Sequence, residues 1–189
     1  MMDVITTAKQ IFVSMVLAFH VESGTVIDQK EAFCMAQAVY FEARQESHSG
    51  KVAVANVIKN RKLSDRFPNT YCGVVKDGPK RESWKTKQHK DLPKHQRVYI
   101  LKRNKCAFSF MCDGKPEILW TSYMDGTPIP GNETAWRDSI NVTLDVMAGN
   151  LKDNTGGALH YANMNIADPY WANSMTVFAV IGNHTFFID

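Results

Sequence analysis

The stretch that decides the fold is Tyr40-Phe41-Glu42-Ala43-Arg44-Gln45-Glu46, which places an acid at the end of a long apolar segment. Before it, apolar residues occupy most sides of a helix, so the pattern predicts a buried helix over residues 30–46. Burial raises the pKa of a carboxylic acid because it disfavours the charged form. Glu42 is therefore a candidate proton donor, and the alternative is an ordinary helix carboxylate paired with Arg44.

Outward from this stretch, apolar spacing and turn residues predict the other elements. The expected helices cover 3–21, 50–63 with Ser47 or Ser49 as N-cap, and 132–149 with Asn132 or Thr134 as N-cap, and the expected strands cover 158–161, 176–181 and 185–188. Phe67-Pro68-Asn69-Thr70 should end the helix before it, the lysine-rich stretch that follows to about Pro93 should be a loop, and residues 94–105 should form a short basic helix. The predicted class is α+β, mainly helical, with a small antiparallel sheet.

Charge is unevenly distributed along this single-domain length of 189 residues. Eleven of the 22 Lys and Arg residues fall in 76–105, where only three acids oppose them, so this segment carries +8 and the remainder of the +3 chain −5. Such asymmetry predicts an anionic partner, which is an envelope surface or a nucleic acid. A nucleic-acid-binding module would use the interleaved Trp84 and Tyr99. Because no known nucleic-acid-binding pattern is present, we do not expect that partner, and a solvated lysine-rich loop is the plainer alternative.

The four cysteines include no Cys-x-x-Cys pair, so no structural zinc site or other metal site is expected. Cys106 and Cys112 flank a short aromatic turn and would close a small disulfide loop in an oxidising compartment, or remain buried thiols. Cys34 lies in the apolar helix and is expected to be a small core residue. The pairing of Cys72 stays open between Cys106 and Cys112.

The N-terminal segment has two interpretations. An apolar run from Ile11 to Phe19 follows Lys9, and Val21-Glu22-Ser23 resembles a small-residue cleavage site. The run is too short to span a bilayer. We favour a packed N-terminal helix over a signal sequence.

A series of ordered motifs is similar to the cell-wall hydrolase or spore-cortex lytic enzyme family (SleB type). The motifs are Tyr40-x-Glu42-Ala43-Arg44-x-Glu46, Gly50-x-Val52-Ala53-Val54-Ala55-x-Val57-Ile58-x-Asn60-Arg61, Phe67-Pro68-Asn69-Thr70-x-Cys72-Gly73-Val74-Val75, Cys106-Ala107-Phe108-Ser109-Phe110-Met111-Cys112-Asp113-Gly114, Gly156-Gly157-Ala158-Leu159-His160-Tyr161-x-Asn163 and Ile181-Gly182-Asn183-His184-x-Phe186-Phe187. The resemblance covers about residues 30–189. It implies a lysozyme-like catalytic domain there, with 1–29 as an N-terminal helical extension.

The chain departs from the family pattern beside the acid. Members commonly carry glycine where this chain has Phe41 and Gln45, and often another acid near Ser49. The Glu-Ala-Arg core is intact, but these changes alter the expected shape of the cleft. The basic segment 76–105 is a second departure.

The resemblance implies cleavage of peptidoglycan glycan strands between N-acetylmuramic acid and N-acetylglucosamine. Glycosidases usually add a second carboxylate to the acid, for which Glu46, Asp65 and Asp113 are the candidates. Glu46 is more simply explained as solvated or bonded to Arg44. A lytic transglycosylase needs no second carboxylate, because the C6 hydroxyl of N-acetylmuramic acid captures the reacting carbon and one glutamate acts as acid and then base. We assign that double role to Glu42, with a muramidase or an N-acetylmuramoyl-L-alanine amidase as alternatives.

Sugars bind through aromatic faces and short polar side chains. The predicted substrate-binding residues, taken from the family motifs, are Phe108, Ser109, Phe110, Tyr161, Asn163, Trp171 and His184. For each aromatic residue, core packing is the alternative, and His184 can equally be structural. Tyr161 and Asn163 should lie on one face of an extended strand.

Other enzyme classes lack their motifs. Gly-x-Ser-x-Gly, His-Glu-x-x-His and phosphate-binding glycine loops are all absent from the sequence, so the serine hydrolase, zinc peptidase and nucleotide enzyme classes are disfavoured. We expect a monomer without a cofactor that acts in the periplasm or cell wall. It would be exported by a bacterium, or made in the cytoplasm and released as a phage lysin.

Overall fold

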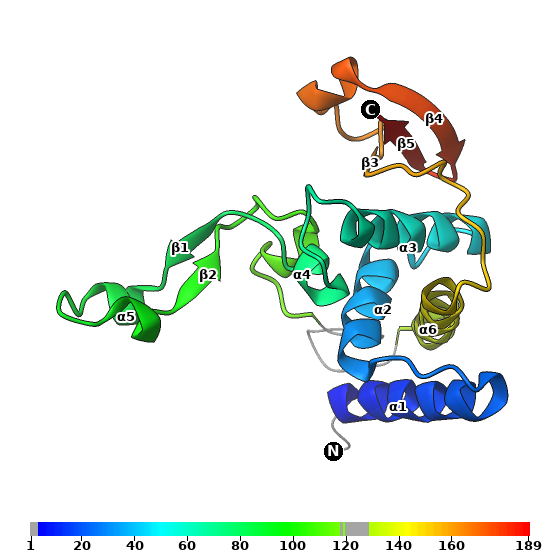
Figure 1. Cartoon of the computed structure of the whole chain (residues 1–189), viewed down its shortest axis with the longest axis horizontal. Helices are drawn as coiled ribbons and strands as arrows, with labels where there is room; N and C mark the ends of the chain where they lie inside the picture. The colour runs from blue at the N-terminus through cyan, green and yellow to red at the C-terminus, as the bar shows by residue number, and fades with distance from the viewer. Residues whose placement is uncertain (1–3, 118, 120–128) are drawn as a thin grey trace.

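The computed structural model describes residues 4–117, 119 and 129–189 and confirms the α+β class (Figure 1). Its helices are α1 (Val4–Ser23), α2 (Gln29–Ala43), α3 (His48–Leu63), α4 (Tyr71–Val75), α5 (Trp84–Lys87) and α6 (Asn132–Ala148), with short 3-10 turns at Lys94–Gln96, Ser109–Met111 and Tyr170–Ser174. Its strands are β1 (Lys80–Glu82), β2 (Tyr99–Leu101), β3 (His160–Ala162), β4 (Thr176–Ile181) and β5 (His184–Ile188).

Helix α2 lies at the centre of the helical body and is buried on opposite sides, as its apolar sequence predicts. One side, which includes Met35 and Val39, packs with α3 and α4. The other side, which includes Tyr40, packs with α1 and α6 around the fully buried Trp136. The helix begins where Asp28 accepts a hydrogen bond from the Glu31 amide (2.9 Å). It ends at Ala43, three residues earlier than predicted, so Glu46 lies in the turn that leads into α3.

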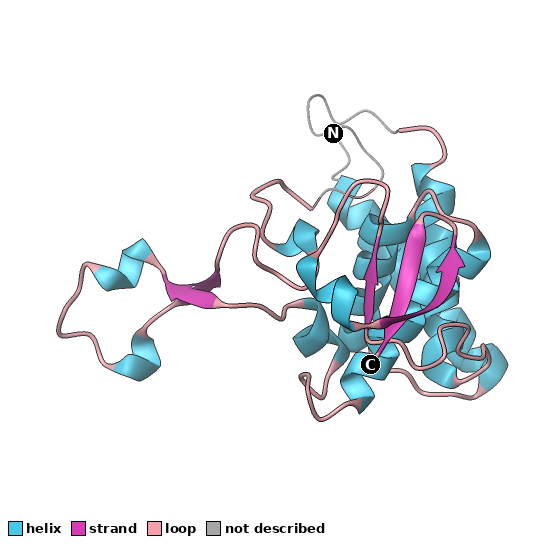
Figure 2. Ribbon diagram, turned by 90° about the horizontal axis from the view of Figure 1, so that it is seen from above, coloured by secondary structure: helices cyan, strands magenta, loops and turns pink. Residues whose placement is uncertain are grey.

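Helix α3 connects the helical body to the sheet. Ser47, one of the two predicted N-caps, accepts a hydrogen bond from the Gly50 amide (3.3 Å). The antiparallel sheet has the order β3-β5-β4, and it lies over α3 in both views (Figures 1 and 2). Ala53 and Val57 of α3 pack there against Ala158 and Phe186. The predicted hairpin around Gly182-Asn183 is confirmed.

Helix α6 confirms the prediction for 132–149, but its N-cap prediction was wrong. The cap is Gly131, in the left-handed conformation (φ 80°), without a side-chain hydrogen bond. Its carbonyl accepts the Ala135 amide (3.0 Å), so the chain is already turning one residue before Asn132.

Two predictions between 67 and 105 were also wrong. The lysine-rich stretch is not a continuous loop, because it contains α4, β1 and α5. Residues 94–105 do not form a helix, because Tyr99–Leu101 pairs with Lys80–Glu82 as an antiparallel strand. Strands β1 and β2 and helix α5 form an arm, residues 79–102, that projects from the body, whereas α4 packs against the body (Figures 1 and 2).

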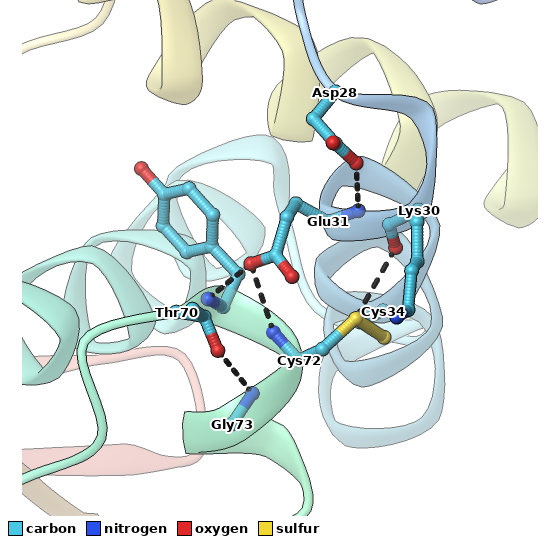
Figure 3. Close-up of a disulfide and its surroundings, with 8 residues drawn as sticks. Asp28, Lys30, Glu31, Cys34, Thr70, Cys72 and Gly73 are labelled. Atoms are coloured by element: carbon cyan, nitrogen blue, oxygen red, sulfur yellow. Dashed lines mark hydrogen bonds between the residues drawn. A yellow bond between two sulfur atoms is a disulfide. The ribbon is translucent and has the colours of Figure 1, made fainter.

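Both disulfides join segments that the site depends on. Cys34 is buried, as predicted for a small core residue, but it pairs with Cys72, so both predicted partners of Cys72, Cys106 and Cys112, were wrong. The bond fixes α4 to α2 (Figure 3). The Glu31 carboxylate lies beside this bond and accepts the backbone amides of Tyr71 (2.5 Å) and Cys72 (3.2 Å). Cys106 pairs with Cys112, which is the small loop predicted as one alternative.

Helix α1 packs on the body through Ala8, Phe12 and Val16. The indole of Trp136 donates a hydrogen bond to the carbonyl of Ala8 (3.2 Å). Within the described part of the chain, none of the helices combines the length and apolar character that crossing a membrane requires. The segment thus packs on the body as the favoured interpretation, a packed N-terminal helix, expects. The division into an N-terminal extension, 1–29, and a catalytic domain, 30–189, stays a prediction.

Candidate active site

A cavity of about 650 Å³ lies between the end of α2, the disulfide loop, strand β3 and the β4–β5 turn. Each of these segments belongs to one of the sequence motifs, although they are far apart in the chain. The cavity is lined by Phe41, Glu42, Arg44, Gln45, Glu46, Arg61, Cys106, Ala107, Ser109, Phe110, Asp113, Tyr161, Ala162, Asn163, Ile166, Ala167, Asn183 and His184.

Glu42 lies in the last turn of α2, where the apolar helix opens into this cavity. Its carboxylate accepts a hydrogen bond from the hydroxyl of Tyr161, with 3.2 Å between Oε2 and the phenol oxygen. Burial raises the pKa of Glu42. The hydrogen bond from Tyr161 and, to a smaller extent, the positive charge of Arg61 lower this pKa, but burial has the larger effect. The outcome is a carboxyl group that holds its proton to a higher pH than an exposed glutamate does.

Tyr161 is positioned by strand β3, where it pairs with Phe186 of β5. Its ring also contacts the ring of His184 edge-on, with 5.0 Å between centroids. Burial raises the pKa of Tyr161 well above its usual value of 10, and the neighbouring Glu42 charge adds to the effect. The phenol therefore stays protonated and remains a donor toward Glu42.

Arg61 is a site residue whose role the sequence reasoning missed. Its side chain is buried, and Nε donates to the carbonyl of Leu159 (2.7 Å), which directly precedes β3. The guanidinium lies over the rings of Phe67 (5.3 Å) and Phe108 (5.4 Å). Nη1 has no hydrogen-bond partner among the described residues. Burial lowers the pKa of Arg61, yet arginine's ordinary pKa is so high that the group remains a cation beside Glu42.

Glu46 connects the helical body to the sheet. Asn183 donates two hydrogen bonds to its carboxylate, one from the side-chain amide (2.7 Å) and one from the backbone amide (3.2 Å). Gly182 adopts a left-handed conformation (φ 60°) there, and a Cβ at this position would lie 1.8 Å from Oε2 of Glu46. The expectation that Glu46 is solvated or bonded to Arg44 is thus corrected.

The structure brings five of the seven predicted substrate-binding residues to the cavity wall: Ser109, Phe110, Tyr161, Asn163 and His184. It does not bring the other two there. Phe108 is 1% exposed and packs in the core beneath Arg61. Trp171 contacts His160 and Phe187, with ring centroids 5.3 and 5.4 Å apart.

The other cavity residues differ in the contacts that their side chains make. Phe110 stacks on Phe41 with 4.7 Å between centroids, and both rings form part of the cavity wall. The Nδ1 atom of His184 is buried without a partner in the described ranges, and burial lowers its pKa, which favours the neutral ring. Of the three candidate second carboxylates, Glu46 and Asp113 line the cavity and Asp65 does not.

No group of three or more His, Cys, Asp or Glu side chains in residues 4–117, 119 and 129–189 is arranged to hold a metal ion. The chemistry that the residues themselves offer is proton transfer, from a half-buried carboxyl group with a phenol and a guanidinium at its side. This arrangement is chemically suited to general acid–base catalysis.

The chain belongs to the cell wall hydrolase family, whose family model matches residues 45–187. Glu42 lies three residues before that match. The spore cortex-lytic enzyme of Bacillus cereus is 33% identical over 158 residues, which are 84% of this chain and 44% of the relative. The spore cortex-lytic enzyme of Halalkalibacterium halodurans is 34% identical over 152 residues, which are 80% of this chain and 33% of the relative. The chain thus spans less than half of the length of these relatives.

Solved structures show the same fold. The catalytic domain of the Bacillus cereus SleB protein is 30% identical with a TM-score of 0.50, and the alignment covers 87% of this chain and 94% of that one. The catalytic domain of the germination-specific lytic transglycosylase SleB from Bacillus anthracis is 31% identical, also with a TM-score of 0.50, over 86% and 97% of the two chains.

Proposed function

We propose that this protein cleaves the glycan strand of peptidoglycan between N-acetylmuramic acid and N-acetylglucosamine. Family membership supports the substrate class, since the relatives are named as spore cortex-lytic enzymes and a structural neighbour as a lytic transglycosylase. The observation that carries the proposal is the carboxyl group of Glu42, which lies half-buried in the cavity with a raised pKa.

In the first step, Glu42 donates its proton to the glycosidic oxygen, and the bond from that oxygen to the muramic acid C1 breaks. The raised pKa supports this step, because a larger fraction of Glu42 carries a proton near neutral pH. The leaving sugar departs with the proton, and Glu42 becomes a carboxylate. The Tyr161 hydroxyl and the Arg61 charge stabilise this anionic form.

In the second step, the Glu42 carboxylate removes the proton of the C6 hydroxyl as that oxygen bonds to C1. The product is a 1,6-anhydro ring, and the acid form of Glu42 is restored. One group therefore serves as acid and base in turn, as in a lytic transglycosylase. The contacts of Glu46 favour this scheme, because both of its oxygens already accept hydrogen bonds from Asn183.

A muramidase is the second candidate, favoured by one observation: Asp113 also lines the cavity. Its carboxylate would assist a water molecule in place of the C6 hydroxyl.

Mass spectrometry of the muropeptides released from purified sacculi tests the proposal. We expect 1,6-anhydromuramic ends. Reducing muramic ends would identify a muramidase instead, and free peptides with intact glycan would identify an amidase and overturn glycan cleavage.

A further inference from the structure

The arm, defined as residues 79–102, leaves the body beside α4 and extends beyond the rest of the molecule (Figures 1 and 2). Its strands pair in register, with Lys80 opposite Leu101 and Glu82 opposite Tyr99. A hydrogen bond from the Lys102 amide to the Pro79 carbonyl (2.8 Å) closes its base. The base of the arm is joined to the cavity wall. The backbone carbonyl of Asp77 accepts a hydrogen bond from the backbone amide of Ala107 (3.0 Å), and Ala107 lines the cavity.

The far end of the arm is ordered by polar contacts. Arg97 donates from its three guanidinium nitrogens to the carbonyl of Leu92 (2.9 Å), the carbonyl of Lys90 (2.8 Å) and the carboxylate of Glu82 (2.8 Å). Thr86 accepts the Val98 amide (3.2 Å), which holds α5 against the start of β2. These contacts hold the backbone of the arm in a defined conformation, from which the other side chains project.

The displayed side chains are strongly cationic. Seven exposed residues carry the charge: Lys80, Arg81, Lys85, Lys87, Lys90, Lys94 and Lys102. None of the seven forms an ion pair with another described residue. Of the two acids in the arm, Glu82 is already paired with Arg97, which leaves Asp91. Unpaired cations at this density attract a surface of negative charge.

Exposed apolar side chains accompany the cations. Trp84 is 66% exposed, Tyr99 53% and Val98 52%. An anionic polymer without bases needs only the charges, because it has no rings to stack on the aromatic side chains. Tryptophan and tyrosine beside lysines are typical of proteins that lie at a lipid surface, where the rings enter the headgroup layer and the ammonium groups meet the phosphates.

We propose that the arm docks the protein on a lipid surface that carries phosphate headgroups of net negative charge. The lysines bind the headgroups, Trp84 and Tyr99 insert among them, and the cavity is held beside the membrane face. This inference does not rest on glycan cleavage, since vesicle binding needs no peptidoglycan.

Sedimentation of the full chain with vesicles tests the docking. We expect binding to phosphatidylcholine mixed with phosphatidylglycerol, weakened by salt, and little binding to phosphatidylcholine alone. The triple variant Lys85→Gln, Lys87→Gln, Lys90→Gln should bind on the order of a hundredfold more weakly. The matched triple variant Lys9→Gln, Lys30→Gln, Lys152→Gln loses the same charge outside the arm, and should bind within about threefold of the wild type because the effect is local. Equal losses in the two triple variants would overturn the proposal.

Tryptophan emission separates lipid insertion from binding to any polyanion. We expect a blue shift of the wild-type emission when the mixed vesicles are added, and its loss in Trp84→Phe, which keeps the other tryptophans. Equally tight binding to soluble polyphosphate or single-stranded DNA, without a blue shift on vesicles, would assign the arm to phosphate polymers and contradict docking on lipid. A circular dichroism spectrum of each variant establishes that it is folded.

Discussion

At the scale of single residues, Glu42 is subject to opposing influences on its pKa. Burial raises the pKa, while the Tyr161 hydroxyl and the Arg61 charge lower it, and burial is the largest effect. A residue that acts as acid and then as base benefits from this balance, because neither of its protonation states is too stable to leave.

The raised pKa predicts that Glu42→Gln stabilises the protein at neutral pH. The folded chain holds the Glu42 proton to a higher pH than the unfolded chain does. The free energy of unfolding therefore falls as the pH rises from the ordinary glutamate pKa, about 4.3, to the raised value. The amide does not titrate, so the stability gain of Glu42→Gln should grow across this interval and level off above it.

Chemical denaturation at a series of pH values measures this difference. Asp65→Asn is the matched control, because it removes an exposed carboxylate outside the cavity. A stability difference for Glu42→Gln that does not change with pH would show that burial does not raise its pKa.

Tyr161→Phe should move the alkaline limb of the pH–activity profile to higher pH. The variant loses the hydrogen bond that favours the charged form of Glu42, so the pKa of this acid rises further. Asn163→Ala is the comparison, since it should lower activity without moving the limb. An unmoved limb in Tyr161→Phe, together with a large loss of melting temperature and unchanged activity per folded molecule, would instead make Tyr161 a core residue.

The sequence predicted the site residues unevenly, for physical reasons. Glu42 was predicted because an acid in an apolar helix is unusual, and the placement of Tyr161 and Asn163 followed from strand alternation. Arg61 was missed because its signal, one cation at the end of the apolar run of α3, reads equally well as a helix C-terminal charge. Phe108 and Trp171 were misplaced because an aromatic residue packs as readily in a core as in a cleft.

At the scale of elements, the β4–β5 turn is fixed to the helical body through Glu46. Glu46→Ala should lower the free energy of unfolding by about 1–3 kcal/mol, since Asn183 loses both of its hydrogen bonds to a charged acceptor. We expect a smaller loss of activity than in Glu42→Gln, because the acid remains. Thermal unfolding and lysis assays measure the two effects, with Asp65→Ala as control. A loss of activity as large as that of Glu42→Gln at unchanged stability would make Glu46 a catalytic carboxylate.

Elements with a strong apolar period were predicted well, and the arm was not. Helices α2, α3 and α6 and strand β5 each bury a row of apolar residues, whereas the side chains of β4 are mostly exposed. The arm has no such row, and its structure depends on the guanidinium contacts of Arg97 and on strands of three residues that pair across 17 or more positions. The Cys34–Cys72 bond was missed for the same reason, since its partners are 38 residues apart and only the fold brings them together.

At the scale of the whole molecule, the cavity is assembled where three parts meet. The helical body supplies Glu42, strand β3 and the residue after it supply Tyr161 and Asn163, and the Cys106–Cys112 loop supplies Ser109 and Phe110. The arm leaves the body beside this loop. The proposed cleavage in the cavity and the proposed docking by the arm therefore use different residues, so we expect changes to one to leave the other intact.

The initial rate of sacculus digestion by Glu42→Gln, at a concentration of folded protein matched to the wild type, tests the central claim most directly. We expect a loss on the order of a hundredfold or more, because the amide keeps the shape of the side chain but cannot donate and recover a proton. Asp65→Asn, the same chemical change outside the cavity, should digest sacculi at the wild-type rate. A folded Glu42→Gln protein with near-wild-type activity would contradict the assignment of Glu42 as the catalytic acid.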